Sequence, residues 1–140
     1  MEMTATAPAT ARKLLNIAPY FIVEDVIESA EFYRDKLGFH FDGYRGDPPS
    51  YVVLVRDNVW IILEDLNRTG LVCPNRKVNP PACWDAYVLV ENVDGLYKEF
   101  KSKGVKIIRS PEKTDYDMIE MEVEDCNGYV LCFGQDLMRS

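Results

Sequence analysis

The sequence contains very few of the residues from which most protein metal sites are built. It has one histidine, His40, and four cysteines, none of them in a CxxC pair or at zinc-finger spacing. Zinc, copper and facial-triad iron sites usually draw on several histidines or on grouped cysteines. The composition therefore argues against most of the common metal centres.

Long apolar runs and an excess of positive charge are absent as well. The longest apolar runs, VWIIL and YVLCF, are too short to span a bilayer, and the net charge is −7. That charge disfavours nucleic acid and anionic membranes as partners, and it leaves room for a cationic ligand. The more common explanation of such a charge is that it simply keeps the protein soluble. The opening MEMTATAPATAR has no secretory pattern, so we expect a cytoplasmic protein with reduced thiols.

What the chain does contain is an internal repeat. The stretch VEDV at residues 23–26 returns as VENV at residues 90–93, and each copy stands between an apolar run and an apolar helical stripe. Asp25 and Asn92 are predicted N-caps of these two helices, and Gly38 and Gly104 are predicted to end them. The rest of each half reads as short strands, giving the order β-α-β-β-β twice.

The first half predicts a strand at 17–23, a second at 39–44 and a hairpin of 51–56 with 59–63. The second half predicts a strand at 84–90, another at 105–108 and a hairpin of 118–124 with 129–133. We expect an α+β protein of two tandem βαβββ modules, with curled, half-open mixed sheets and helices on the convex side. The predicted boundaries are a flexible tail at 1–13, module one at 14–65, a connector at 66–83 and module two at 84–137.

This arrangement resembles the vicinal-oxygen-chelate superfamily, which includes glyoxalase I, extradiol dioxygenases and bleomycin-resistance proteins. The resemblance covers residues 15–136. The segments that carry it are PYFIVEDVIESAEFYRDKLGF, YVVLVRDNVWIIL, DAYVLVENVDGLYKEF and VEDCNGYVLCF. The metal-free branch typified by bleomycin-resistance proteins is the most similar, because its members are acidic, carry aromatic residues in their clefts and lack the metal ligands.

The resemblance also implies where a metal would be bound. Catalytic members use His or Glu side chains from the first and last strands of each module. Counting from the motifs, these positions fall on Ala18, Ile62, Asp85 and Cys132. Alanine and isoleucine donate nothing to a metal, and one carboxylate with one thiol is too few ligands of mismatched hardness. We therefore expect no metal and no cofactor at this place.

Strand alternation then sorts side chains to the concave face that this family uses for binding. The aromatic residues should form the walls of this face. Glu120 and Glu122 alternate with apolar residues that are expected to pack on the helix, so the two glutamates should project onto the concave face beside Cys132. A face of this kind suits a flat, aromatic or cationic small molecule. The predicted ligand-binding residues are Tyr20, Tyr51, Trp60, Glu64, Asp85, Tyr87, Glu120, Glu122 and Cys132.

Three functions remain open at this point. The first is a metal-independent binding protein of the drug-sequestration type, whose cleft the resemblance places between the subunits of a homodimer. The second is a metal-dependent lyase or dioxygenase with a non-standard site, which would use Glu64, Asp85 and one of Glu120 or Glu122. The third is an accessory module that works through its dimer surface. Whether the protein is an enzyme is uncertain, and the missing ligands favour a binder.

Overall fold

The computed structural model describes residues 12–139, so most of the expected tail at 1–13 lies outside the described residues. The first half forms a three-stranded sheet in the order β1-β3-β2, from β1 (Tyr20–Ile22), β2 (Tyr51–Arg56) and β3 (Val59–Glu64). Strand β1 runs parallel to β3, and β2 runs antiparallel to it. One helix, α2 (Val26–Leu37), accompanies this sheet.

The second half forms a four-stranded sheet in the order β4-β7-β6-β5. Its strands are β4 (Ala86–Leu89), β5 (Lys106–Lys113), β6 (Met118–Glu124) and β7 (Val130–Asp136), with helix α4 (Val93–Ser102). The α+β class and the two half-open sheets are therefore confirmed. The connector also holds a short helix that was not predicted, α3 (Asn75–Val78). No helix within residues 12–139 is long and apolar enough to cross a membrane.

The predicted helix caps are present. The carboxylate of Asp25 accepts a hydrogen bond from the Glu28 amide, and the Asn92 side chain accepts one from the Gly95 amide. These bonds satisfy backbone donors that the first turn of a helix leaves unpaired. Gly38 ends α2 in the left-handed region, at φ 77°.

The predicted strand at 39–44 is wrong. Only single bridges form there, from His40 to Val55 and from Arg45 to Tyr51. Asp42 and Gly43 stand between the bridges, and both residue types are poor strand formers that favour bends. The first sheet consequently has three strands where the second has four.

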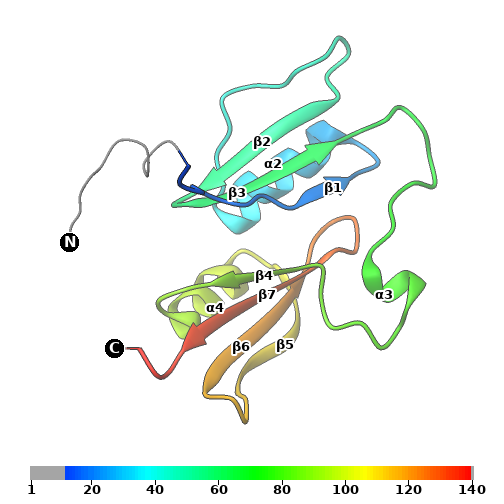
Figure 1. Cartoon of the computed structure of the whole chain (residues 1–140). Helices are drawn as coiled ribbons and strands as arrows, with labels where there is room; N and C mark the ends of the chain where they lie inside the picture. The colour runs from blue at the N-terminus through cyan, green and yellow to red at the C-terminus, as the bar shows by residue number, and fades with distance from the viewer. Residues whose placement is uncertain (1–11, 140) are drawn as a thin grey trace.

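The predicted register of the first hairpin is confirmed, with Val55 opposite Trp60 and Val53 opposite Ile62. The faces follow from it. The core-facing set consists of Phe21, Val23, Ile61, Leu63, Leu131 and Phe133, with Ala86 and Val88 packed against it. The opposite face of each sheet carries the predicted ligand-binding residues. In Figure 1, α2 and α4 lie behind the strands, so both open faces point toward the viewer.

One hydrophobic core spans both halves, and buried polar contacts connect them. Tyr33 of α2 donates a 2.5 Å hydrogen bond to Asp125, the first residue after β6. Tyr129, which directly precedes β7, stacks on Phe21 at 4.3 Å and donates to the Ile22 carbonyl at 2.6 Å. The last hairpin of the second half is thereby fixed against the first half.

Asp125 is buried, and burial raises its pKa to about 6 despite hydrogen bonds from Tyr33 and from the amides of Asn127 and Tyr129. Burial disfavours the charged form, so the folded state retains a proton that the unfolded state has already released between about pH 4 and pH 6. The contribution of this group to stability is therefore fully present below pH 4 and is lost as the pH rises toward 6.

Replacing Asp125 by Asn should remove this loss. The free energy of unfolding of the natural protein, minus that of D125N, should fall by about 2 to 3 kcal/mol between pH 4 and pH 7. Urea denaturation of both proteins at several pH values measures it. The matched control is D115N, because Asp115 is an exposed turn carboxylate. A difference between the natural protein and D125N that does not change with pH would contradict the assignment.

Candidate functional site

The open face of the first sheet is aromatic and partly exposed. Tyr20 and Trp60 are 50% and 47% exposed, and Tyr51 lies directly opposite Glu64 in the hairpin. The Tyr20 hydroxyl donates a 2.5 Å hydrogen bond to Glu64 Oε1, and this bond raises the pKa of the phenol. Four of the predicted residues therefore share one surface that offers two rings and a carboxylate to solvent.

The open face of the second sheet is organised around two buried glutamates. Glu120 is 1% exposed and Glu122 is 6% exposed. Arg109 of β5 donates to both, at 3.0 Å each. Glu120 also accepts hydrogen bonds from the hydroxyls of Tyr87 at 2.8 Å and Tyr116 at 2.7 Å. Burial opposes ionisation of Glu120, but these bonds outweigh it, and its pKa lies below the ordinary value.

A second arginine reaches this face from the connector. Arg76 of α3 donates to Glu122 at 2.8 Å and, through Nε, to the Ala82 carbonyl at 3.0 Å. The two carboxylates thus face two guanidinium groups. The glutamates do lie on the predicted face beside Cys132, whose register partner on β6 is Glu122. They differ from the predicted row of available carboxylates, because their charge is balanced within the chain.

Asp85 and Cys132, the two potential donors among the inferred metal positions, are also occupied or shielded. Asp85 accepts hydrogen bonds from the amides of Asn75 and Val130, both at 2.8 Å, so its carboxylate holds the connector against β7. The Cys132 side chain is fully buried, and burial together with Glu120 and Glu122 raises its pKa to about 12. A thiol in this state is protonated at neutral pH and is neither a good nucleophile nor a metal ligand.

The residues present do not fit a metal of the kind that the resemblance implies. Ala18 and Ile62 offer no donor atom, and no group of three or more His, Cys, Asp or Glu side chains within residues 12–139 is arranged to hold an ion. The predicted alternative set of Glu64, Asp85 and Glu120 or Glu122 is accordingly not brought together. His40 lies exposed at a single bridge to β2.

Sequence reasoning missed Arg109, Arg76, Tyr116 and Gly134. The predicted strand ended at Ile108, whereas β5 continues to Lys113 with two irregularities in its pairing that bring Arg109 opposite Glu122. Gly134 leaves room for Tyr87, whose ring crosses β7 at this point, because a Cβ atom would collide with the Tyr87 hydroxyl oxygen and the ring edge that carries it. A buried glutamate pair on a strand is itself a signal, since it requires cationic partners nearby.

Within residues 12–139 the two sheets lie next to each other, and their open faces point the same way (Figure 1). A hollow of about 410 Å³ lies between β1 and the connector and is lined by Tyr20 and Asp85, one predicted residue from each half. The remaining predicted residues lie on separate sheets.

Comparison with known proteins gives a family and a fold. The model of the Glyoxalase/Bleomycin resistance protein/Dioxygenase superfamily matches residues 13–133. No curated protein sequence matches the chain.

Solved structures with the same fold cover nearly the whole chain. TioX from Micromonospora sp. ML1 has a TM-score of 0.69 at 14% identity, covering 87% of this chain and 98% of that one. A bleomycin resistance determinant encoded on the transposon Tn5 has a TM-score of 0.67 at 20% identity, covering 86% and 97%. A glyoxalase/bleomycin resistance protein/dioxygenase from Nocardioides has a TM-score of 0.65 at 17% identity, covering 92% and 87%.

The buried ionic cluster predicts a large cost for removing Arg109. In R109A the carboxylates of Glu120 and Glu122 lose the guanidinium that they share, and the free energy of unfolding should fall by about 3 kcal/mol. Urea denaturation measures the loss. R34A is the matched control, because Arg34 forms an exposed pair with Asp35 on α2 and should change stability little. Equal effects of the two substitutions would show that the cluster does not stabilise the fold.

Proposed function

The chain belongs to the glyoxalase/bleomycin resistance protein/dioxygenase superfamily, and we propose that within it the protein is a metal-independent binder of a small aromatic or cationic molecule. The ligand would be sequestered without chemical change, in an aromatic and acidic cleft formed between two copies of the chain. The observation that carries the proposal is the open face of the first sheet, where Tyr20 and Trp60 are half exposed beside Glu64.

Aromatic rings on an open sheet favour a planar ligand. A flat ring system gains contact area against Trp60 and Tyr20 at little cost in side-chain entropy, and a positive charge on it gains further from the ring faces. The similarity to the fold of a bleomycin resistance determinant supports a drug-like ligand. Glu64 is the carboxylate to which a ligand cation has direct access, since its only side-chain partner within residues 12–139 is the neutral Tyr20 hydroxyl.

On the second sheet the carboxylates are already paired with arginines, so a ligand cation would have to compete with these arginines. A cation that approached Glu122 would compete with Arg76, which comes from a short connector helix and is partly exposed. Arg109 is held by both glutamates and belongs to a strand, so it is the harder of the two to displace. The predicted residues Asp85, Tyr87, Glu120, Glu122 and Cys132 would then form the floor and walls of the cleft, while Tyr20, Tyr51, Trp60 and Glu64 contact the ligand first.

The second copy is proposed because one chain leaves both faces open. Tyr20, Trp60 and Leu89 are large hydrophobic side chains that are 50%, 47% and 68% exposed. Exposed apolar patches of this kind commonly mark interaction surfaces. Placing the first sheet of one copy across the second sheet of its partner would cover them and produce two equivalent clefts.

Binding is tested by calorimetric titration with bleomycin and with a simple planar cation, 9-aminoacridine. We expect dissociation constants tighter than about 1 mM, and W60A should weaken binding by about three- to thirty-fold, because the ring-face contact is lost. I27A is the matched control, since Ile27 is an exposed apolar residue on α2, away from the open faces. Binding should be the same before and after treatment with EDTA.

Two results would contradict this function. The first is a purified protein that carries a stoichiometric divalent ion whose removal abolishes binding, which would return the metal-dependent lyase or dioxygenase as the better explanation. The second is the absence of any binding tighter than millimolar together with an unaltered dimer, which would favour an accessory module that works through its dimer surface.

The dimer is tested independently by light scattering. The mass in solution should be about twice the chain mass of 16.1 kDa. L89E, which places a charge on the exposed side chain at the end of β4, should shift the protein toward the monomer by at least tenfold in dissociation constant, since an interface core rarely tolerates an unpaired charge. I27E should leave the mass unchanged. A monomeric natural protein would contradict the proposed cleft.

A further inference from the structure

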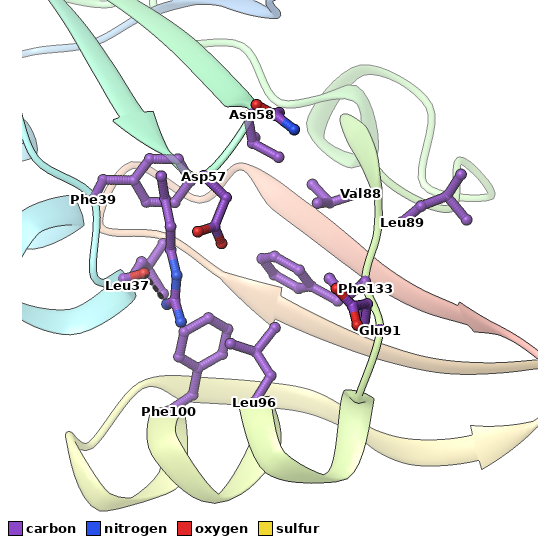
Figure 2. A pocket seen from close by; sticks show the side chains of 13 residues that line it. Leu37, Phe39, Asp57, Asn58, Val88, Leu89, Glu91, Leu96, Phe100 and Phe133 are labelled. Carbon is purple, nitrogen blue, oxygen red and sulfur yellow. Dashed lines mark hydrogen bonds between the residues drawn. The ribbon is translucent and has the colours of Figure 1, made fainter. Parts of the chain in front are cut away.

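A second hollow lies at the junction of the two halves. Its volume is about 360 Å³, within the range of small-ligand sites. Figure 2 shows it between the β2–β3 turn, the end of β4, helix α4 and the end of helix α2. Its apolar lining includes Leu37, Phe39, Leu96, Phe100 and Phe133, together with Val59 and residues 88–90 at the end of β4.

The internal repeat gives this hollow a counterpart in the same molecule. Residues 67 positions apart are equivalent around the two helices, as Val23 and Val90 are in the repeated VEDV and VENV stretches. By this count Phe100 is the equivalent of Tyr33, and Leu96 is the equivalent of Ser29. The junction at α2 and the junction at α4 are therefore two versions of one place in the module.

At the α2 junction the space is filled by the last hairpin. Five residues, Asp125 to Tyr129, separate β6 from β7. Tyr129 lays its ring on Phe21 and hydrogen bonds to the Ile22 carbonyl, Asp125 bonds to Tyr33, and the Asn127 amide donates to Ser29 Oγ at 3.0 Å. An aromatic ring with polar groups at its edge completes this version of the junction.

At the α4 junction the corresponding hairpin is shorter and its residues are smaller. Only Asp57 and Asn58 separate β2 from β3. The residue in the place of Tyr129 is Val59, by the same count that equates Ile62 with Cys132 in the last strands, and the residue in the place of Phe21 is Val88. Valine in place of tyrosine, and again in place of phenylalanine, leaves a ring-sized volume unfilled. The hollow therefore lies where the first half of the repeat has no counterpart of the Tyr129 ring.

The charged side chains around the hollow indicate whether a cationic, neutral or anionic molecule would bind there. The charge of Arg56 is already matched by Glu99, because its guanidinium donates to both Glu99 carboxylate oxygens at 2.8 and 2.9 Å, as well as to the Leu37 carbonyl at 2.7 Å. Asp57 and Glu91 have no hydrogen-bond or ion-pair partner for their carboxylates within residues 12–139. Figure 2 shows the Asp57 carboxylate turned toward the space between the phenylalanine rings. The local balance is two unmatched negative charges around an aromatic floor.

We propose that this junction pocket is a binding site for a small arylalkylamine cation, a single aromatic ring joined by a short chain to a protonated amine. The ring takes the volume that Tyr129 fills at the other junction, against Phe39, Phe100 and Phe133. The ammonium group lies at the mouth, where Asp57 and Glu91 supply the opposite charge. The site lies within one chain and touches neither Trp60 nor Glu64, and Leu89 is the one lining residue that it shares with the proposed dimer surface.

The test uses 2-phenylethylamine, with 2-phenylethanol and 3-phenylpropionate as neutral and anionic probes of similar size. Amide shifts in ¹H–¹⁵N spectra of the full chain should move at Asn58, Glu91 and Leu96, and these junction shifts should persist in W60A, whatever shifts the amine causes on the open face of β1 and β3. Affinity should decrease from the amine to the alcohol to the acid. The double variant D57N/E91Q should weaken amine binding by about five- to ten-fold and leave the alcohol unaffected.

The variants are chosen to preserve the fold. Asp57 has a φ of 53°, a conformation that asparagine adopts at least as readily as aspartate, so D57N keeps the turn. D115N/E31Q is the matched control, because it removes two exposed carboxylates distant from the pocket and should leave amine affinity unchanged. W60A should also leave it unchanged, which separates this site from the open faces.

Four outcomes would overturn the proposal. These are no amine-dependent shifts at the junction, shifts confined to the open sheet faces, equal affinity for amine and alcohol, and amine affinity that survives in D57N/E91Q. A loss of amine binding in W60A would instead place the amine on the open face. Failure of bleomycin or 9-aminoacridine to bind would reject the proposed function alone and leave this site standing.

Discussion

The structure depends on the buried contact between the last hairpin and the first helix. Tyr33 and Asp125 are separated by most of the chain, yet their side chains share a short hydrogen bond inside a single core. A buried carboxylate is tolerated only when its oxygens are satisfied, and here the hydroxyl and two backbone amides do so. This contact sets how the second sheet lies against the first, and hence where both open faces point.

The same contact is also the point at which the repeat is broken. The two halves agree in their caps, their stripe of core residues and their strand order, because each module must bury one helix on one sheet. They differ in the length and side chains of the last hairpin, and those differences produce one filled junction and one hollow junction. The features that the two halves share are structural. The features in which the halves differ, above all the last hairpin, determine where a pocket can form.

Much of the fold followed from local rules that the sequence states directly. Asp25, Asn92 and Gly38 marked the helix ends because capping is a one-residue event, and the Asp57–Asn58 pair fixed the hairpin register because strand alternation has a period of two. The strand expected at 39–44 does not form. The alternation of Phe39 and Phe41 suggested a strand, but Asp42 and Gly43 bend the chain there and leave only isolated bridges.

The sequence predicted which face of the sheet carries the candidate site residues, but it did not predict which of their charges are paired. Alternation placed Glu120 and Glu122 on the open side correctly, since the parity of a strand is local information. Their neutralisation was not predictable, because Arg109 reaches them only through irregular pairing of β5 and Arg76 arrives from a connector without any periodic pattern. Which charges meet depends on tertiary geometry, and a row of acids in a sequence does not reveal whether it is free or paired.

The proposed cleft between two copies and the junction pocket differ in how ligand binding relates to assembly. In the proposed dimer, a ligand held between two open faces would contact both copies, so it would stabilise the dimer and bind more weakly as the protein is diluted. A ligand in the junction pocket contacts residues of both halves of one chain, such as Asp57 and Leu96, so it stabilises the contact between modules at any concentration. The two kinds of site are therefore distinguished by whether the observed affinity depends on protein concentration.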